Sequence, residues 1–334
     1  MIMWLGFILA AYSVVGNDVI QTLGTFLTSN EEKVSWYVLW AFAATIMAVT
    51  LVYGWFQYDG DVSYQRLIGD ADKGFSMDNP TYLDPRNIEG FNWVYVLPPL
   101  VLMVITRIGI PVSTSFLILT FFSPKNLGDM VVKSMLGYVV AFSAAIVLYL
   151  FITKSLEKKF INNPLEDNQR KWWIAAQWAS TGFLWTQWLA QDFANIYVYL
   201  PRQLDGASLA ISLVILLSLL GYIFYSRGGA IQGIVRAKTN TADIRSATFV
   251  DLSYGIVLFF FKELNNIPMS TTWVFLGLLA GREIALRYNL LKTVPKATLT
   301  DLAKDLGKVF LGLVISIGLV YLIQWLNGGL SIGG

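Results

Sequence analysis

Two short motifs place a carboxylate beside carboxamides inside long apolar stretches. They are Asn17-Asp18-x-x-Gln21 and Gln191-Asp192-x-x-Asn195. Residues three apart share one face of a helix, so each Asp and the carboxamide that follows it are expected to project together. Such oxygen ligands suit a hard cation such as Na⁺. Two alternatives stay open, a carboxylate that its neighbouring amides satisfy for packing and a carboxylate that binds H⁺.

The position of these carboxylates inside apolar sequence indicates that they bind a ligand or an ion. An acidic side chain at the centre of an apolar membrane helix costs at least ~2.5 kcal/mol on insertion scales, so such residues are rare unless they bind something. Asp18 and Asp192 both lie well inside apolar sequence. We therefore predict cation sites at the two motifs, made by Asn17, Asp18, Gln21, Gln191, Asp192 and Asn195.

A second pair of motifs carries hydroxyl groups. Pro111 precedes Ser113-Thr114-Ser115, and Pro268 precedes Ser270-Thr271-Thr272. Proline before a helix start is pre-organised, and Ser or Thr caps the first turn. The first N–H groups of a helix have no internal partner and lie at its positive dipole end, so two such helix starts could bind a tetrahedral anion. Alternatively, these hydroxyls only cap ordinary helices or bond to their own backbone.

Three further charged residues lie close to these hydroxyl motifs in the sequence. Arg107 precedes the first motif, and a guanidinium suits an oxyanion, so Arg107 is either a substrate ligand or half of a structural pair. Lys262 and Glu263 precede the second motif. These two could neutralise each other or anchor Asp18 or Asp192.

Composition places all these motifs in a lipid environment. Hydrophobic residues make up 55% of the 334 residues and charged residues only 14%, whereas soluble chains carry about 25% charged residues. The chain has no histidine and no cysteine, which excludes Ser-His-Asp and Cys-His catalysis and imidazole or thiolate metal sites. The net charge of +2 gives no reason to expect a nucleic-acid partner.

The apolar stretches divide into two kinds. Six are expected to cross the membrane, because each is close to the ~20 residues that a ~30 Å hydrocarbon core requires. Among them are the N-terminal stretch up to about Leu27 and the stretches Val34–Phe56, Val131–Ile152, Ala207–Phe224 and Leu306–Leu326. Two others are interrupted, at Gly109-Ile110-Pro111 and at Asn265-Asn266-Ile267-Pro268. Pro and Gly without flanking charges are typical of the tip of a re-entrant hairpin rather than of an exposed loop. The hairpins are predicted over residues 91–123 and 246–287.

The distribution of charge predicts how the chain is oriented. The linker 153–171 and the loop 227–245 are basic and should be cytoplasmic by the positive-inside rule, whereas the loop 58–90 is acidic and should lie outside. Two crossings lie between the basic segments, as this orientation requires. The protein is then integral to the cell membrane, or to the inner membrane if the cell is Gram-negative, with both termini outside.

The predicted fold is an all-α polytopic membrane protein made of two inverted-topology repeats, residues 1–152 and 172–334. The cytoplasmic linker 153–171 joins them, and each repeat has three spanning helices and one re-entrant helical hairpin. The duplicated motifs support this division, since Gly109–Ser115 aligns with Asn266–Thr272 and Gly16–Gln21 with Ala190–Asn195. Inverted repeats place a substrate site near the membrane midplane.

These paired motifs resemble those of the inorganic phosphate transporter (PiT) family. That family carries Gly-Ala-Asn-Asp-x-x-Asn and Leu/Ile-Pro-Val-Ser-Thr-Thr, each twice. The corresponding segments here are Val15–Gln21, Leu189–Asn195, Ile110–Ser115 and Ile267–Thr272. The chain departs from the pattern at Gln21 and Gln191, and Phe116 and Trp273 stand where a histidine often follows the Ser-Thr-Thr run. The large central cytoplasmic domain of some members is also missing.

The resemblance implies a transporter rather than an enzyme, with no cofactor other than Na⁺ as coupling ion. Asp18, Asp192 and their amides would serve Na⁺ and phosphate, and the hydroxyl tips and Arg107 would hold phosphate. Members run symport with Na⁺ or H⁺ and often form homodimers. The family also has a sulfate branch, but a carboxylate accepts a hydrogen bond from protonated phosphate and repels sulfate, which favours phosphate.

We therefore predict Na⁺-coupled symport of inorganic phosphate across the bilayer by alternating access. An H⁺-coupled permease for sulfate or another oxyanion is the alternative within this fold. An intramembrane enzyme acting on lipid phosphates and a channel are the alternatives from other classes. The enzyme would need a nucleophile or metal cluster, for which the chain offers only carboxylates.

Overall fold

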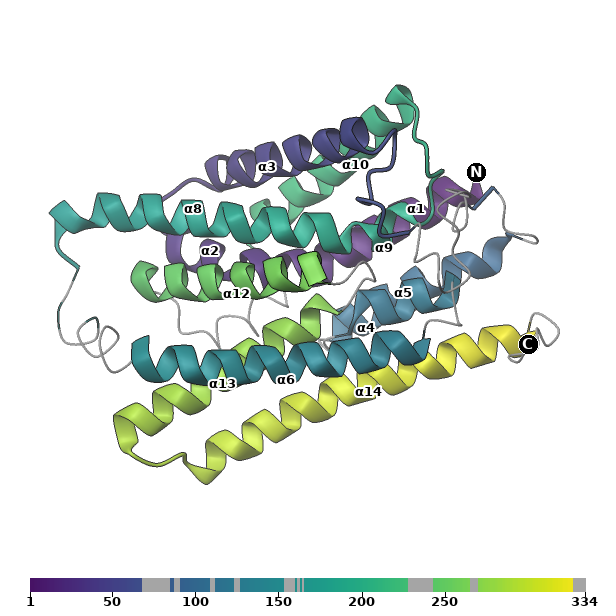
Figure 1. Cartoon of the computed structure of the whole chain (residues 1–334). Coiled ribbons are helices and arrows are strands. Elements are labelled where there is room, and N and C mark those ends of the chain that lie inside the picture. The colour runs from purple at the N-terminus through teal and green to yellow at the C-terminus, as the bar shows by residue number, and fades with distance from the viewer. Residues whose placement is uncertain are drawn as a thin grey trace.

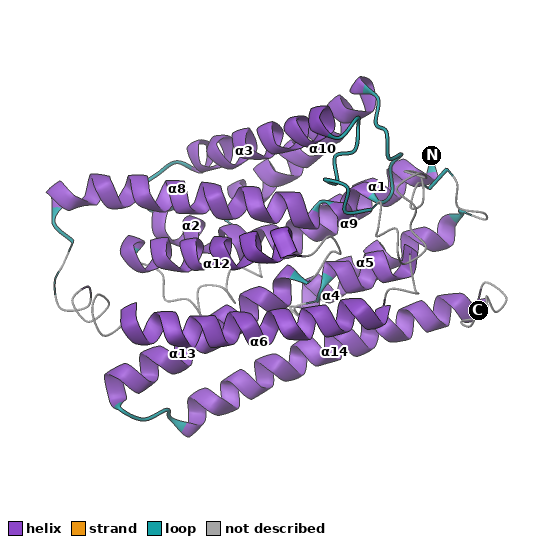
Figure 2. Ribbon diagram, in the orientation of Figure 1, coloured by secondary structure: helices purple, strands orange, loops and turns teal. Residues whose placement is uncertain are grey.

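The computed structural model describes residues 1–67, 85–86, 91–108, 112–122, 127–152, 160, 163, 165–227, 243–264 and 270–326. Within these ranges the regular structure is entirely helical, so the predicted all-α class is confirmed (Figure 2). The first half contains α1 (Ile2–Val14), η1 (Val15–Val19), α2 (Ile20–Asn30), α3 (Trp36–Gln57), η3 (Trp93–Val96), α4 (Leu97–Ile108), α5 (Thr114–Phe122) and α6 (Leu127–Ile152). The second half contains α8 (Asp167–Asp192), α9 (Ala194–Tyr197), α10 (Gly206–Tyr225), α12 (Ile244–Leu264), α13 (Thr271–Leu291) and α14 (Lys296–Leu326).

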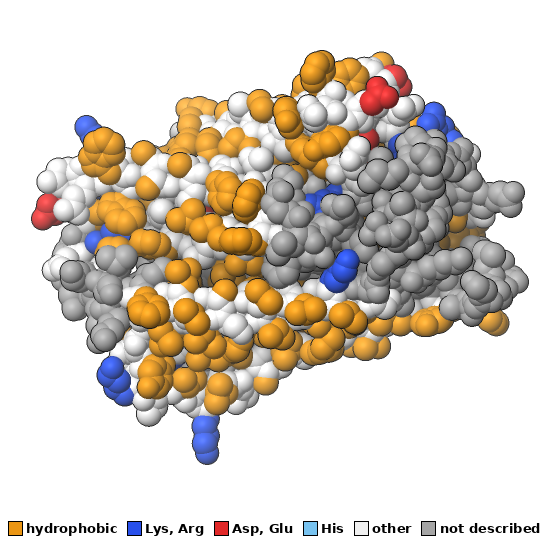
Figure 3. Space-filling model, viewed as in Figure 1, with side chains coloured by type: hydrophobic (Ala, Val, Ile, Leu, Met, Phe, Trp, Pro, Cys, Tyr) orange, Lys and Arg blue, Asp and Glu red, His pale blue; other side chains and the backbone are white. Residues whose placement is uncertain are grey.

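Four helical stretches are long and apolar enough to cross a membrane. They are Ile2–Val19, Trp36–Gln57, Val131–Phe151 and Gly206–Tyr225, and all four coincide with predicted crossings. In the space-filling view, apolar side chains cover much of the described surface, and charged side chains lie mostly toward the two ends (Figure 3). This distribution fits a protein whose middle faces lipid.

The helix α14 begins ten residues before its predicted start at Leu306. Its additional turns carry Asp301, Lys304 and Asp305, so they suit an aqueous surface rather than lipid. With 31 residues the helix is about 46 Å long. It is therefore longer than a hydrocarbon core of ~30 Å, and part of it can extend into water.

The helices of each predicted hairpin are neighbours. The helix α4 packs against α5, and α12 packs against α13. The residues at the two tips, 109–111 and 265–269, lie outside the described part of the chain. The packing fits two helical hairpins, while their re-entrant path through a membrane stays a prediction.

The most extensive helix pairs join α13 to α6 and α12 to α8. Two glycines one turn apart, Gly277 and Gly281, let α13 approach the α6 backbone. A Cβ atom at Gly277 would lie 2.5 Å from the carbonyl oxygen of Tyr138, and one at Gly281 would overlap the carbonyl of Phe142. Small residues four apart are the usual means by which membrane helices come this close.

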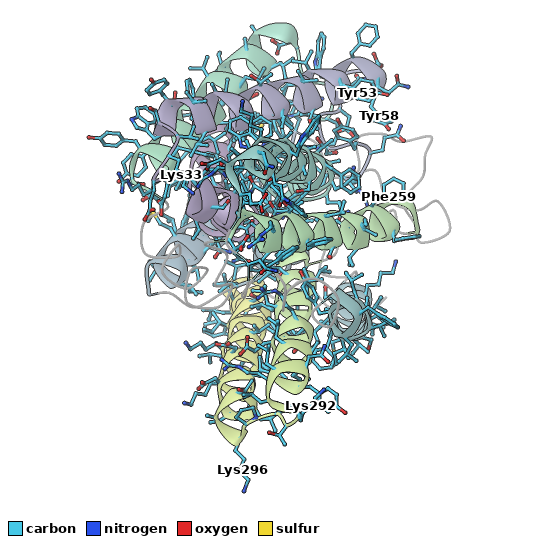
Figure 4. All side chains as sticks on the ribbon, turned by 90° about the vertical axis from the view of Figure 1, so that its left-hand side faces the viewer. Lys33, Tyr53, Tyr58, Phe259, Lys292 and Lys296 are labelled. Carbon is cyan, nitrogen blue, oxygen red and sulfur yellow. The ribbon has the colours of Figure 1, made fainter. Side chains whose placement is uncertain are left out.

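The start of α1 and the end of α14 lie on the same side of the molecule (Figure 1). The end of α6 and the start of α8 lie on the opposite side. Lys33, Lys292 and Lys296 all emerge from helix ends in the view onto that opposite side (Figure 4). Basic residues therefore gather where the sequence predicts the cytoplasm, although the orientation in a membrane remains a prediction.

Candidate functional site

Both acidic motifs lie where a helix is irregular. Asp18 lies in the π-helical turn Val15–Val19 between α1 and α2, and Asp192 ends α8 just before a break at Phe193. Both carboxylates are buried, each with 1% of its surface exposed. Wide turns and breaks release backbone groups from the regular helical ladder, and they frequently occur at functional sites.

In the first half, the Asp18 carboxylate receives a hydroxyl from the first hairpin. The Thr114 hydroxyl donates to Oδ2 of Asp18 at 2.7 Å. The Asn17 carboxamide donates to Oδ1 of Asp18 at 2.7 Å and to the carbonyl of Val112 at 3.0 Å. Asn17 and Thr114 thus attach the π-helical turn to the start of α5.

The second half repeats this contact. The Thr271 hydroxyl, which occupies the position equivalent to Thr114 in its own motif, donates to Oδ2 of Asp192. The Asn195 carboxamide donates to Oδ1 of Asp192 at 3.3 Å and to the Thr114 hydroxyl at 2.9 Å. Asn195 therefore connects the carboxylate of the second half to the hairpin of the first.

The first hydroxyl of each motif caps its helix. The Ser113 Oγ accepts the backbone N–H of Phe116 at 3.3 Å, and the Ser270 Oγ accepts that of Trp273 at 3.3 Å. The rings of Phe116 and Trp273 are in edge contact, with centroids 6.3 Å apart. The starts of α5 and α13 are therefore built alike and meet in the interior of the protein.

The third hydroxyl of each motif lies near the carboxylate of the other half. Thr272 is close to Asp18, and Ser115 is close to Asp192. The Ser115 Oγ and the Asn195 Oδ1 are buried and have no hydrogen-bond partner among the described atoms. Buried polar atoms are normally satisfied, so these two oxygens can accept a hydrogen bond from a further group.

Two of the four predicted carboxamides, Gln21 and Gln191, do not bond to the carboxylates of their motifs. Gln21 Nε2 donates to the Asn17 side chain at 3.3 Å, so the expected pairing of Gln21 with Asp18 is not formed. The π-helical turn explains this, since its wider spacing brings Gln21 over Asn17 instead. Gln191 Nε2 donates to the carbonyl of Leu258 at 2.7 Å and ties α8 to α12.

The two central carboxylates belong to one buried network. Asn195 donates to Asp192 and to the Thr114 hydroxyl, which in turn donates to Asp18. Two buried carboxylates linked in this way require cations or protons to be stable in the interior. The sequence also indicated three charged residues, Arg107, Lys262 and Glu263. Their side chains lie outside the described part of the structure.

A third buried carboxylate, Asp251 on α12, was not predicted. It accepts hydrogen bonds from the hydroxyls of Thr25 on α2 and Thr181 on α8, and from Gln177 at 3.5 Å. Gln177 in turn accepts from Asn30 at 2.9 Å. An acidic residue inside the apolar stretch 247–261 was the available signal, the same one that identified Asp18. These oxygens are of the kind that Na⁺ takes.

A transporter of known structure has the same fold. The similarity is to "The sodium-dependent phosphate transporter", with a TM-score of 0.63, 16% sequence identity, and coverage of 99% of this chain and 98% of that chain. No family model matches the chain, and no curated protein matches it. The chain thus has the fold of a membrane transporter, and the resemblance to the phosphate transporter family is confirmed at the level of the fold.

Proposed function

We propose that this protein is a secondary transporter that moves inorganic phosphate inward with Na⁺, as a divergent member of the inorganic phosphate transporter family. One observation carries the proposal most. The contact of Thr114 with Asp18 recurs as the contact of Thr271 with Asp192, in a chain that shares its full-length fold with a sodium-dependent phosphate transporter.

The recurrence supports two inverted repeats, residues 1–152 and 172–334, around one central site. Each half supplies an acidic motif at a helix irregularity and a hydroxyl motif at a helix start. The Asn195–Thr114 hydrogen bond crosses between the halves at this point. Alternating access then follows if one half rocks against the other, since the site lies where the two halves meet.

The coupling ions occupy the two carboxylates in this proposal. Asp18 offers Oδ1 and Oδ2 with the Asn17 and Thr114 side chains beside them, and Asp192 offers the same with Asn195 and Thr271. The threonine hydroxyls donate to the carboxylates. When Na⁺ binds, the hydroxyl oxygen lone pairs and the carboxylate oxygens can both face the ion. Proton coupling at the same carboxylates is the alternative.

Phosphate lies between the two helix starts in this proposal. Ser115 Oγ, the Thr272 hydroxyl and the first free N–H groups of α5 and α13 are its hydrogen-bonding groups. Protonated phosphate can also donate to a carboxylate, which sulfate cannot do. The unpartnered Ser115 Oγ and Asn195 Oδ1 support this position. Ser113 and Ser270 cap the first turns of α5 and α13. In this proposal they stabilise the helix starts and do not bind phosphate.

Asp251 is a further place for a cation. Its carboxylate is 1% exposed and hydrogen-bonds to neutral groups from α2 and α8. A buried carboxylate whose bonding partners are neutral is stabilised by a monovalent cation or a proton. We include it as a second kind of coupling site, separate from the central pair.

Uptake of radiolabelled phosphate into proteoliposomes tests the substrate. Saturable uptake that an inward Na⁺ gradient stimulates, and that excess unlabelled sulfate does not block, is the expected result. Competition by sulfate would reassign the oxyanion, and uptake driven only by a proton gradient would reassign the coupling ion. Absence of phosphate and sulfate uptake would contradict the proposed function.

A further inference from the structure

The helix α12 carries two buried polar side chains on one face. Asp251 and Tyr254 are three residues apart, so they lie on the same side of the helix, and their exposed fractions are only 1% and 2%. The helix lies between α8 and α13 (Figure 1) and packs against both of them and against α2. Asp251 bonds to α2 and α8, whereas Tyr254 bonds to α13.

The Tyr254 side chain holds the first turn of α13 at two points. Its hydroxyl donates to the carbonyl of Thr271 at 3.1 Å, and its ring contacts the ring of Phe275, with centroids 5.4 Å apart. Thr271 is the first residue of α13, and its own hydroxyl donates to Asp192. The orientation of the Thr271 hydroxyl toward Asp192 therefore depends on Tyr254.

The hydrogen bond from Tyr254 is additional to those that the helix makes. A carbonyl oxygen has two lone pairs, and inside a helix the carbonyl of one residue accepts the N–H of the residue four positions later. The Thr271 carbonyl thus keeps a partner when the tyrosine hydroxyl is removed. Tyr254→Phe would therefore remove a contact between α12 and α13 and leave no backbone group unsatisfied.

A path of bonded groups joins Asp251 to Asp192. Hydroxyls from α2 and α8 donate to Asp251. Tyr254 follows one turn later on the same helix and donates to Thr271, which in turn donates to Asp192. Rigid helices can carry coupling between sites, so a displacement of α12 at Asp251 also moves Tyr254 and the Thr271 hydroxyl.

The corresponding positions of the first half are apolar. Relative to the prolines of the two hydroxyl motifs, Leu97 corresponds to Tyr254 and Val94 corresponds to Asp251. Neither of these apolar side chains can donate or accept a hydrogen bond. The path from a buried carboxylate through a tyrosine to a hydroxyl motif therefore belongs to the second half alone, and it is added to the motifs that the two halves share.

We propose that Tyr254 is a positioning residue that couples a cation at Asp251 to the Asp192 site. This inference deepens the proposed function and rests on it. A monovalent cation at Asp251 fixes α12 against α2 and α8, and Tyr254 then holds the Thr271 hydroxyl in place for Na⁺ at Asp192. Without that cation α12, and with it the start of α13, is less firmly held. The coupling is reciprocal, since Na⁺ at Asp192 must raise the cation affinity of Asp251 by the same factor.

The Na⁺ dependence of phosphate uptake by Tyr254→Phe, Asp251→Asn and the double variant tests this assignment. Tyr254→Phe should raise the Na⁺ concentration for half-maximal uptake about twofold to tenfold, the range expected for one lost hydrogen bond. The KM for phosphate at saturating Na⁺ should not change. In the Asp251→Asn background the same substitution should have little further effect, because the cation that Tyr254 responds to is already lost.

A matched control separates coupling from stability. Tyr64 donates to the carbonyl of Thr50 at 2.5 Å in the loop after α3, so Tyr64→Phe removes the same kind of hydrogen bond elsewhere in the protein. This control should leave the Na⁺ dependence as in the wild type, whatever it does to thermal stability. Tyr254→Phe should differ from it by the change in Na⁺ dependence.

Two results would overturn the inference and leave the proposed function standing. Equal shifts caused by Tyr254→Phe in the wild-type and Asp251→Asn backgrounds would show that Tyr254 acts independently of Asp251. A wild-type Na⁺ response in Tyr254→Phe, with or without lower thermal stability, would leave Tyr254 with a packing role alone. If the wild-type protein itself shows no Na⁺-coupled phosphate uptake, the proposed function and this inference are both contradicted.

Discussion

The Thr114 hydroxyl donates to the Asp18 carboxylate at 2.7 Å while it accepts a hydrogen bond from Asn195 at 2.9 Å. One threonine on the first hairpin thus connects the acidic motif of its own half to that of the other half. A rearrangement at either carboxylate must change the bonding of this hydroxyl. Thr114 therefore links the hydrogen bonding of the two acidic motifs.

Neutralising either central carboxylate should remove the response to Na⁺. In Asp18→Asn and Asp192→Asn the side-chain shape is kept and the charge is lost, so cation affinity should fall more than tenfold. Uptake measured against Na⁺ concentration checks this. Asp301→Asn, at an exposed position on α14, is the matched control. Normal Na⁺-dependent uptake by Asp18→Asn would contradict the cation assignment.

Removing the second hydroxyl of each hydroxyl motif, Thr114 or Thr271, should lower ligand affinity to a similar extent in both halves. Thr114→Val and Thr271→Val keep the branched shape but leave a buried carboxylate with one hydrogen bond fewer, at a cost of about 1–3 kcal/mol. Phosphate or Na⁺ affinity should fall accordingly. Thr300→Val, at an exposed position on α14, should have no effect. Strong loss in one half with none in the other would argue against equivalent roles for the two tips.

Asp251→Asn should change Na⁺ dependence without changing phosphate recognition. The amide still bonds to the hydroxyls of Thr25 and Thr181, but it no longer attracts a cation. We expect a higher Na⁺ concentration for half-maximal uptake and a lower Hill coefficient, with an unchanged KM for phosphate at saturating Na⁺. An unaltered Na⁺ response would show that Asp251 has only a packing role.

Close contact between α13 and α6 should make Gly277 and Gly281 intolerant of side chains. Alanine at either position would press against an α6 carbonyl, so the helices must separate, at a cost of about 1–3 kcal/mol. Thermal unfolding of the detergent-solubilised protein measures this. Gly307→Ala and Gly318→Ala are controls, because a Cβ there meets nothing within 4 Å. Equal stability of the variants at all four positions would contradict the close packing.

The start of α10 should weaken in acid. The Asp205 carboxylate accepts the Ser208 N–H at 2.9 Å and the Ser208 hydroxyl at 2.8 Å, and these bonds hold the pKa of Asp205 below its usual value. The cap is therefore fully formed above the usual aspartate pKa of about 3.9 and is lost as pH falls through the lower folded-state pKa. Hydrogen exchange at the Ser208 amide should accelerate, relative to its intrinsic rate, over that range. Asp205→Ala should abolish this pH-dependent change in the exchange rate of the Ser208 amide.

The central motifs could be predicted from the sequence because each is a charged or hydroxyl-bearing run inside apolar surroundings. Asp18, Asp192, Thr114 and Thr271 all had this local signal. Gln21 could not be placed, because periodicity assumes a regular helix and the π-helical turn at Val15–Val19 changes the register.

The packing of the loop 60–67 could not be predicted for a different reason. This loop is polar, and such loops are ordinarily exposed. Only the tertiary structure, through the contact of Asp61 with Arg202, shows that it packs against the chain next to α9. The sequence indicated Arg107 because it is adjacent to a hydroxyl motif along the chain. Proximity along the chain and proximity in space differ most at loops.

Accumulation of phosphate against its own gradient is the most direct test of coupled transport. Proteoliposomes with equal phosphate on both sides should concentrate radiolabelled phosphate inside when an inward Na⁺ gradient is applied. They should lose it when a Na⁺ ionophore collapses that gradient. Phosphate that only equilibrates across the membrane, whatever the Na⁺ gradient, would contradict a Na⁺-coupled secondary transporter and indicate a passive pathway.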